Sequence, residues 1–434
     1  MIYLDFAAAT PVSRKALEAM KPYFAEDFFN PSSPYLPAKK VAADYEAAKS
    51  EIAHCIGAKG SDIVITAGAT EANNLAFTAL RGQGLGSAFS SAGLEFSGTS
   101  YAGRPGEPSP TETNLSASSG IYVPKNSNHF MLQKKQSSSP KVLFLETEHD
   151  SVRRVAEQYG GVPIKVLSSG LIDLADLRKK ITDETEMISV SLANNELGTI
   201  QLLAEVAAII REVKLDRMRR GIKRQLLLHS DASQALNLLD VNVARMGVDL
   251  MTLNSAKVYG PKGVGALYVS HEARLHPLVA GGGQEKGLRS GTENVPGVIG
   301  FAAALSEAKK HIKSNRAKYG ELKQILLSEL QGYELVNRKH CLDNFIVLCY
   351  NGLDAERLIF LLEEKGVYVA TGAACAASKG VRSHVLAAIG LSESEIAGSL
   401  RLSLGELNDA EQMHEAARII NEVVEAERKR LTES

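Results

Sequence analysis

The chain has 434 residues, 44% of them hydrophobic and 23% charged, and a formal net charge of -1. This length fits two or three domains, or one large α/β unit with a smaller companion. The balanced charge offers no basic surplus for nucleic acid or anionic membranes, and no apolar run reaches the roughly 18 residues of a membrane span. Asp5 lies where a signal peptide would need apolar residues, and four cysteines are too few for a disulfide scaffold. We therefore expect a cytoplasmic protein with reduced thiols and with neither nucleic acid nor membrane as a partner.

Four short apolar runs predict strands that are buried on both faces. They are Lys141–Glu146, Met187–Ala193, Gln225–Ser230 and Leu250–Ser255. Helical patterns alternate with them, one after Asp173 and one from Leu202. This alternation predicts an α/β fold in which a mostly parallel sheet lies between helices.

Two parts of the chain, one before and one after these alternating strands and helices, have a different composition. Residues 82–139 are rich in Ser and Gly and lack sustained periodicity, which predicts a disordered or surface insertion. From about Phe301 onward, long amphipathic helices appear together with the strand-like runs LDNFIVLCY and GVYVA. We expect these to form a smaller α+β domain.

Polar residues follow the predicted strands at their carboxyl ends. In open α/β sheets, ligands bind beside those ends and the neighbouring helix amino termini. Four strands that end in this way predict one shared site. The residues concerned are Glu148 and His149, Asn194 to Glu196, Asp231 and Gln234, and Lys257.

Lys257 and Asp231 are the two residues that most strongly suggest a chemistry. A lysine in apolar surroundings loses its charge more easily and can form a Schiff base with a carbonyl. The alternative is a strand-end lysine whose ammonium extends to water. Asp231 could pair with a protonated pyridine nitrogen, or it could simply cap the following helix.

Thr70, His149, Cys375 and Arg401 could complete such a site. Thr70 lies in the glycine-containing turn TAGATEANNLA, which could bind a phosphate, although capped helices after turns are common. His149 could stack on a ring or transfer protons, or it could be structural. Cys375 lies among small residues that suit an exposed loop and a reactive thiolate, and Arg401 could bind a carboxylate or form an internal salt bridge.

The other motifs are less informative. Cys55, Cys341 and Cys349 lie in or beside predicted core elements, so we expect them to act as small hydrophobic residues. We find no nucleotide-binding glycine motif, no zinc-ligand spacing and no internal repeat, and we expect no metal.

Ten segments in chain order resemble the cysteine desulfurases, within the class V aminotransferase group of pyridoxal-phosphate enzymes. The resemblance covers nearly the whole chain except the insertion. The longer cysteine loop in CAASKGVRSHVLAAIG looks like the subgroup that serves iron–sulfur cluster assembly. The segments are YLDFAAATP, NPSS, TAGATEANNLA, TEHDSV, NNELGTIQ, HSDASQ, AKVYGPKG, GGGQEKGLRSGTENVPG, TGAACAAS and SLRLSLG.

The resemblance implies the fold and the role of each matching residue. It implies a fold-type I enzyme with a large cofactor-binding domain at 15–310 and a small domain, formed by 1–14 and 311–434, that carries the cysteine loop. Lys257 would bind pyridoxal 5'-phosphate as a Schiff base, and Cys375 would take the sulfur. The other implied cofactor contacts are Asp231 with the ring nitrogen, Gln234 with the ring hydroxyl, His149 stacked on the ring and managing a proton, Thr70 with the phosphate, and Ala69 and Asn254. The implied substrate contacts are Asn195, Arg401 and Asn30, and Thr292 would reach the phosphate of the partner subunit in a homodimer.

The implied reaction removes sulfur from L-cysteine, giving L-alanine and a persulfide on Cys375. An acceptor protein such as an iron–sulfur scaffold would then take the sulfur. The alternatives are a selenocysteine lyase, another class V aminotransferase-like enzyme, or a degenerate homologue that acts as a scaffold. The usual histidine and serine before the lysine are replaced by Ala256 and Asn254, and a usual histidine after NPSS is absent. These departures predict weaker cofactor retention.

Overall fold

A seven-stranded sheet forms the centre of the computed structural model, which describes residues 1–80, 141–337, 339–371 and 382–433. β8 is antiparallel to both of its neighbours, and the other strand pairs are parallel. The predicted α/β class with a mostly parallel sheet is therefore confirmed. In sheet order the strands are β2 (Ile63–Thr66), β8 (Gly265–Val269), β7 (Leu250–Asn254), β6 (Leu227–Asp231), β5 (Met187–Ser189), β3 (Val142–Leu145) and β4 (Val162–Ile164).

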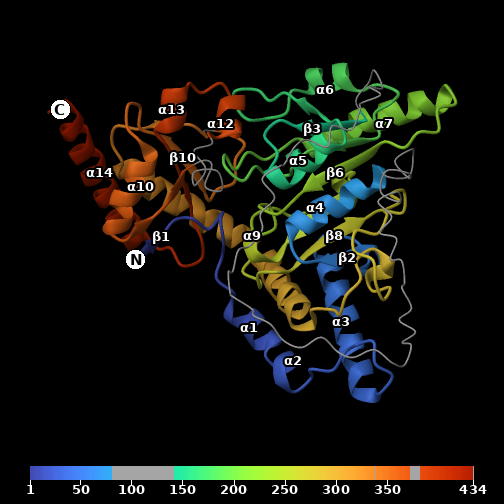
Figure 1. Ribbon diagram of the computed structural model, residues 1–434. Helices are drawn as coiled ribbons and strands as arrows, with labels where there is room; N and C mark the ends of the chain where they lie inside the picture. Colours follow the sequence, from blue (N-terminus) through green and yellow to red (C-terminus); the bar gives the residue numbers. More distant parts are fainter. Residues whose placement is uncertain (81–140, 338, 372–381, 434) are drawn as a thin grey trace, which may run out of the picture. The chain divides into compact units, whose positions relative to one another are not determined.

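Alternate strand residues pack against helices on opposite faces of this sheet. Leu143 and Leu228 belong to the apolar core shared with α3 (Leu36–Cys55), α7 (Leu203–Arg219) and α9 (Val295–Glu329). Phe144 and Leu227 belong to the core shared with α4 (Ala69–Phe77) and α5 (Asp150–Gln158). Because successive strand side chains point to opposite faces, two-sided burial explains why these strands are apolar throughout. Figure 1 shows the resulting layers, with α4 and α5 over one face of the sheet.

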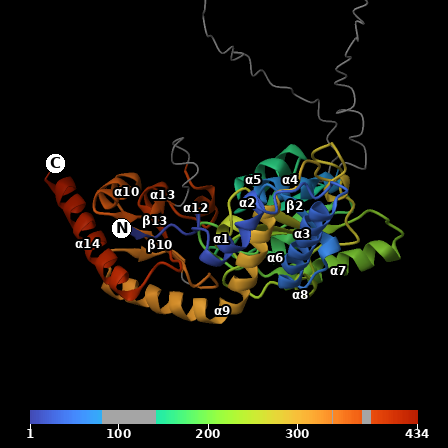
Figure 2. The same cartoon turned by 90° about the horizontal axis from the view of Figure 1, so that it is seen from below.

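A second, antiparallel sheet lies beside the C-terminal helices. Its order is β12 (Ala370–Thr371), β13 (Ser399–Ser403), β10 (Phe345–Cys349) and β9 (Glu334–Leu335). The chain's first strand, β1 (Ile2–Tyr3), pairs in parallel with β11 (Val367–Tyr368). The long helix α9 packs against α1 (Arg14–Met20) and α3 and also against α14 (Ala410–Thr432), as Figure 2 shows. The remaining helices are α2 (Pro22–Ala25), α6 (Leu174–Lys180), α8 (Val243–Met246), α10 (Ala355–Glu364), α12 (His384–Ala388) and α13 (Glu393–Ala397).

Local sequence explains where several helices begin. The Asp173 side chain accepts hydrogen bonds from the backbone N–H groups of the first turn of α6, and Asp409 caps α14 in the same way. Asn294 caps α9 and is followed by a proline within its first turn. Helix α4 instead has Gly68 at its N-cap, and the φ of 144° there suits a residue without a side chain.

Some predictions about the elements need correction. The strand predicted over Met187–Ala193 ends at Ser189, although backbone hydrogen bonds to β6 continue from Val190 and Leu192. Strands β2, β4 and β8 also belong to the sheet, although no strand was predicted at these positions. The predicted insertion at 82–139 lies outside the described residues. The predicted domain boundary at 310 lies within α9, which runs to Glu329, and the domain division stays a prediction. Within the described ranges, no helix is both long enough and apolar enough to cross a membrane.

Candidate active site

Asp231 lies at the end of β6 and takes part in a chain of side-chain hydrogen bonds that reaches His149. Its two carboxylate oxygens accept from Asn73 Nδ2 and from the Ser233 backbone N–H, both at 2.9 Å. Asn73 Nδ2 also lies 2.8 Å from Ser151 Oγ, which is 2.9 Å from His149 Nδ1. The aspartate is buried and the histidine is exposed. The structure therefore brings two predicted residues together through α4 and α5.

The structural alternative for Asp231 was the cap of a following helix; its carboxylate caps a turn instead, and no helix follows it directly. His149 caps α5, because its Nδ1 accepts from the Ser151 backbone N–H at 3.1 Å. That contact assigns the ring's acceptor role to Nδ1 in the neutral form, so the proton is on Nε2. Nε2 is then the ring nitrogen that can donate to a ligand.

Lys257 and Gln234 meet at the N-terminal segment. Lys257 Nζ donates to the backbone oxygens of Ala7 and Ala8, at 2.7 and 2.5 Å, and Gln234 Nε2 donates to the oxygen of Ala7 at 3.1 Å. Lys257 ends the 3₁₀ turn Ser255–Lys257, which follows β7, and its side chain is half-buried. Because β7 lies next to β6 in the sheet, this turn places the amine on the same sheet edge as Asp231.

The turn that was predicted to bind a phosphate lies at the start of α4. The first-turn N–H groups of an α-helix have no partner within the helix, and they carry partial positive charge. Here that turn includes Ala69, which is half-buried, and Thr70, which is exposed. The neighbouring Glu71 carboxylate is paired with Arg289 Nε at 3.0 Å, so its charge is balanced beside the site.

Arg401 makes an internal ion pair, which was the structural alternative to a substrate contact. Its Nη2 lies 2.6 Å from Asp5 Oδ1, and its Nη1 donates to the backbone oxygen of Asn195 at 2.9 Å. Only 4% of Arg401 is exposed, and its Nε is buried with no hydrogen-bond partner among the described residues. The structure thus brings Asn195 to Arg401 and adds Asp5, which sequence reasoning did not select.

Buried carboxyl groups lie directly behind the site. Burial, and then the charge of Asp231, raise the pKa of Glu148 to about 8. Its Oε1 accepts from the Ser191 backbone N–H at 2.7 Å, and its Oε2 has no partner among the described residues. Burial likewise raises the pKa of Glu196 to about 7. Burial lowers the pKa of His229, two residues before Asp231, to about 4. At pH 7 Glu148 and His229 are therefore mostly neutral, which leaves less competing charge around Asp231, whereas Glu196 is about half ionised.

Other predicted residues are not brought into these contacts. Asn30 and Thr292 are exposed, and Asn254 accepts from the Ala256 backbone N–H at 3.2 Å as the cap of the turn before Lys257. Cys375 lies outside the described residues. Sequence reasoning missed Asn73, although its place one helical turn after Thr70 on α4 was a usable signal.

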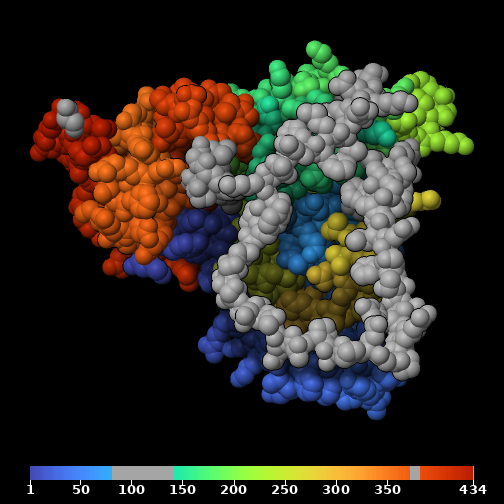
Figure 3. All heavy atoms as spheres, viewed as in Figure 1, coloured from blue at the N-terminus to red at the C-terminus, as the bar shows by residue number. Residues whose placement is uncertain are grey.

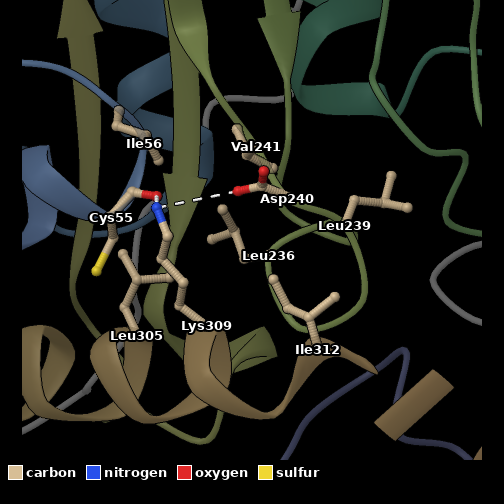
Figure 4. A pocket seen from close by; sticks show the side chains of 9 residues that line it. All are labelled: Cys55, Ile56, Leu236, Leu239, Asp240, Val241, Leu305, Lys309 and Ile312. Carbon is tan, nitrogen blue, oxygen red and sulfur yellow. Dashed lines mark hydrogen bonds and ion pairs between the residues drawn. The ribbon is translucent and has the colours of Figure 1, made fainter. Parts of the chain in front are cut away.

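The remaining cysteines and a separate pocket do not join the site. Cys55 and Cys349 are buried, as predicted, but Cys341 is half-buried and lies 3.9 Å from Lys323 Nζ, so its expected core role is wrong. Figure 4 shows a small, mostly aliphatic pocket in which Lys309 Nζ lies 4.0 Å from Asp240 Oδ1. No predicted site residue lines this pocket. Among the described residues, no group of side chains is arranged to hold a metal ion.

The residues present fit pyridoxal phosphate. Buried polar atoms without partners among the described residues, Asn73 Oδ1 and Ser233 Oγ, lie on the two side chains next to Asp231. A carboxylate beside such atoms suits a cationic ring nitrogen with polar substituents. At the start of α4, the space that a Cβ on Gly68 would occupy is open to 4 Å, so an anion can approach the backbone closely.

Comparisons with known proteins agree with this arrangement. The sequence model of the class-V aminotransferase family matches residues 2–89 and 122–415. The chain is 32% identical to the cysteine desulfurase IscS 1 of Archaeoglobus fulgidus, over 98% of this chain and 97% of that protein. Among solved structures, it resembles a NifS-like protein with a TM-score of 0.79 and 25% identity, over 98% of this chain and 99% of the other. It also resembles SspA in complex with cysteine, with a TM-score of 0.69 and 29% identity, over 93% and 99% of the two chains. The chain belongs to the class-V aminotransferase family, among its cysteine desulfurases.

Proposed function

We propose that this enzyme transfers the sulfur of L-cysteine to Cys375, giving L-alanine and a persulfide. The C–S bond of the substrate breaks, an S–S bond forms on Cys375, and the thiol proton balances the new C–H bond of alanine. A thiol of an acceptor protein, such as an iron–sulfur scaffold, then removes the outer sulfur by exchange. We place the reaction in the cytoplasm, where thiols stay reduced.

One structural observation carries the proposal. Lys257, Asp231 and His149 come from elements far apart in the sequence and lie at one edge of the sheet. They take part in two adjacent sets of hydrogen bonds. The first set is Asp231, Asn73, Ser151 and His149, and the second joins Lys257 and Gln234 at Ala7. A purely structural protein has no physical need for an amine, a buried carboxylate and an imidazole at one such edge.

Each residue has a task in the proposed reaction. Pyridoxal phosphate, when bound, supplies a conjugated ring that accepts the electron pair left on the substrate's Cα. Thr70 and the first turn of α4 hold its phosphate, and Asp231 and Gln234 hold its ring. The Lys257 amine takes the proton from Cα and later returns one, while His149 donates from Nε2. Arg401 and Asn195 bind the substrate carboxylate.

We further propose that the enzyme is a homodimer, with Thr292 facing the partner's phosphate site. Several apolar side chains between residues 17 and 36 are exposed, and this segment belongs to the blue region at the bottom of Figure 3. The exposed fractions are 52% for Leu17, 65% for Phe24, 66% for Phe28, 50% for Tyr35 and 80% for Leu36. A second copy of the chain would cover this surface.

The test is an assay of alanine and sulfide from L-cysteine, with visible absorbance of the purified protein. Lys257→Ala is expected to lose the visible cofactor absorbance and at least about 100-fold in rate. Cys375→Ala is expected to keep the absorbance and lose persulfide formation. Cys341→Ala, the matched control, is expected to keep both. Full sulfide release by Cys375→Ala would contradict the proposal and favour a β-eliminating relative, and a colourless native protein with pyridoxal phosphate added would favour a scaffold.

A further inference from the structure

Arg401 is a buried cation whose hydrogen-bonding capacity is only partly used. It lies in the middle of β13, opposite Val347 on β10 and Ala370 on β12. A guanidinium has five N–H donors in a planar fork, which suits two parallel bonds to one carboxylate. Asp5 uses a single oxygen on Nη2, and Nε has no partner in the described part of the chain. The contact between Arg401 and Asp5 is therefore monodentate.

Asp5 is held by its backbone rather than by its side chain. Its neighbours on both sides bond to β13, since the Ser403 N–H donates to the Leu4 oxygen at 2.7 Å and the Ala7 N–H donates to Ser403 Oγ at 2.8 Å. The Asp5 side chain is 17% exposed, against 5% for Arg401. The carboxylate can therefore rotate towards water about its own side-chain bonds while the segment stays in place.

We propose that Asp5 is a specificity-determining residue that neutralises Arg401 in the unliganded enzyme and is displaced by the carboxylate of the substrate. This rests on the proposed function, because it takes Arg401 to be the receptor of that carboxylate. A ligand with a carboxylate replaces one monodentate contact by a bidentate one, so the exchange is favourable. A ligand without a carboxylate cannot neutralise the positive charge of Arg401. The ion pair between Arg401 and Asp5 therefore persists, and the ligand gains no binding free energy from Arg401.

The test is calorimetric titration of the holoenzyme with the product L-alanine and, separately, with ethylamine, which lacks the carboxylate. Asp5→Asn keeps the shape but removes the competing charge. It is expected to lower the Kd of L-alanine about tenfold, the scale of one charge-assisted hydrogen bond. It should leave the affinity for ethylamine unchanged. The same variant without ligand should unfold at a lower temperature, because Arg401 then lacks its counter-charge. Asp5→Ser is a second neutral variant with the same expectation, should Asp5→Asn fold poorly.

Asp343→Asn is the matched control, because Asp343 pairs with Arg316 at 2.7 Å elsewhere on the protein. It is expected to leave both affinities unchanged. Equal or weaker binding of L-alanine by the Asp5 variants, or an equal gain for ethylamine, overturns the inference alone. If Arg401→Lys binds L-alanine as well as the native enzyme does, the proposed role of Arg401 fails, and the inference fails with it.

Discussion

The buried ion pair between Lys49 and Glu285 offers a quantitative test of how the loop beside the site is held. Glu285 and Lys286 have positive φ angles of 46° and 59°, which non-glycine residues adopt only when their surroundings enforce it. Both Glu285 oxygens lie 3.0 Å from Lys49 Nζ, and they also accept from Tyr45 Oη at 2.6 Å and from the Ile65 N–H at 2.8 Å. The side chains of Lys49 and Glu285 are only 6% and 5% exposed.

Replacing Lys49 by Met is expected to destabilise the protein by about 3 kcal/mol. Loss of one partner from a buried pair costs about 3–5 kcal/mol. The lower end of this range applies because Tyr45 Oη and the Ile65 N–H still donate to the Glu285 carboxylate. The reverse variant, Glu285→Gln, should cost less, because Lys49 Nζ also lies 3.7 Å from the exposed Glu46. The double variant should recover part of the loss of Lys49→Met, since it leaves no uncompensated charge.

The assay is the urea midpoint of unfolding for the native chain, both single variants and the double variant. Since the loop continues through Arg289, which pairs with Glu71 in the first turn of α4, the proposed phosphate contact should weaken and cofactor affinity should fall together with stability. A double variant no more stable than Lys49→Met would refute the reasoning, because it would show that the cost is not uncompensated charge. So would a Lys49→Met variant that unfolds at the native midpoint.

Three further results are expected. Because burial raises the pKa of Glu148 to about 8, from 4.5 for an unperturbed glutamate, the unfolded chain loses this proton first and stability falls as the pH rises through this range. Glu148→Gln should therefore flatten the fall in unfolding temperature between about pH 6.5 and pH 8, and an unchanged slope would count against it. Ala256→His restores the hydrogen-bond donor that usually precedes the lysine, so it should tighten pyridoxal phosphate binding about tenfold in a spectrophotometric titration of the apoenzyme. An unchanged affinity would show that this donor does not contribute to cofactor binding. Asn73→Ala should weaken cofactor binding by a similar factor while leaving Lys257 reactive towards the aldehyde of the free cofactor, and native affinity would exclude a role for Asn73 in holding Asp231.

Sequence patterns were sufficient for the central strands and for the residues at their ends. Runs such as Lys141–Glu146 are apolar on both faces because helices cover both faces of the sheet. Parallel strands place their carboxyl ends on one edge, so Asp231 and Lys257 could be predicted to lie near each other before any contact was known. Strand β8 was not predicted because no α-helix, only a 3₁₀ turn, lies between it and β7, so the alternation of strands and helices does not mark it. Strand β4 contains Pro163, a residue that argues against a strand in a sequence pattern.

Contacts between distant segments could not be predicted in this way. Asp5 and Arg401 are 396 positions apart, and nothing in the composition around either residue names its partner. The pairing depends on β13 receiving the N-terminal segment, which is a property of the assembled fold. Asn73 was overlooked for a related reason, because its contact with Asp231 spans 158 positions.

Residues 5–8 touch the site at two points, through the Asp5 carboxylate on Arg401 and the Ala7 and Ala8 oxygens on Lys257. Residues 5–8 form a turn that is closed by a hydrogen bond from the Ala8 N–H to the Asp5 oxygen at 3.0 Å. This turn therefore sets the separation between the Arg401 guanidinium and the Lys257 amine, and with it the proposed distance between the substrate's carboxylate and that amine. An insertion or deletion of one residue there would break this turn and shift one contact against the other by up to about 3.5 Å, more than a hydrogen bond can tolerate.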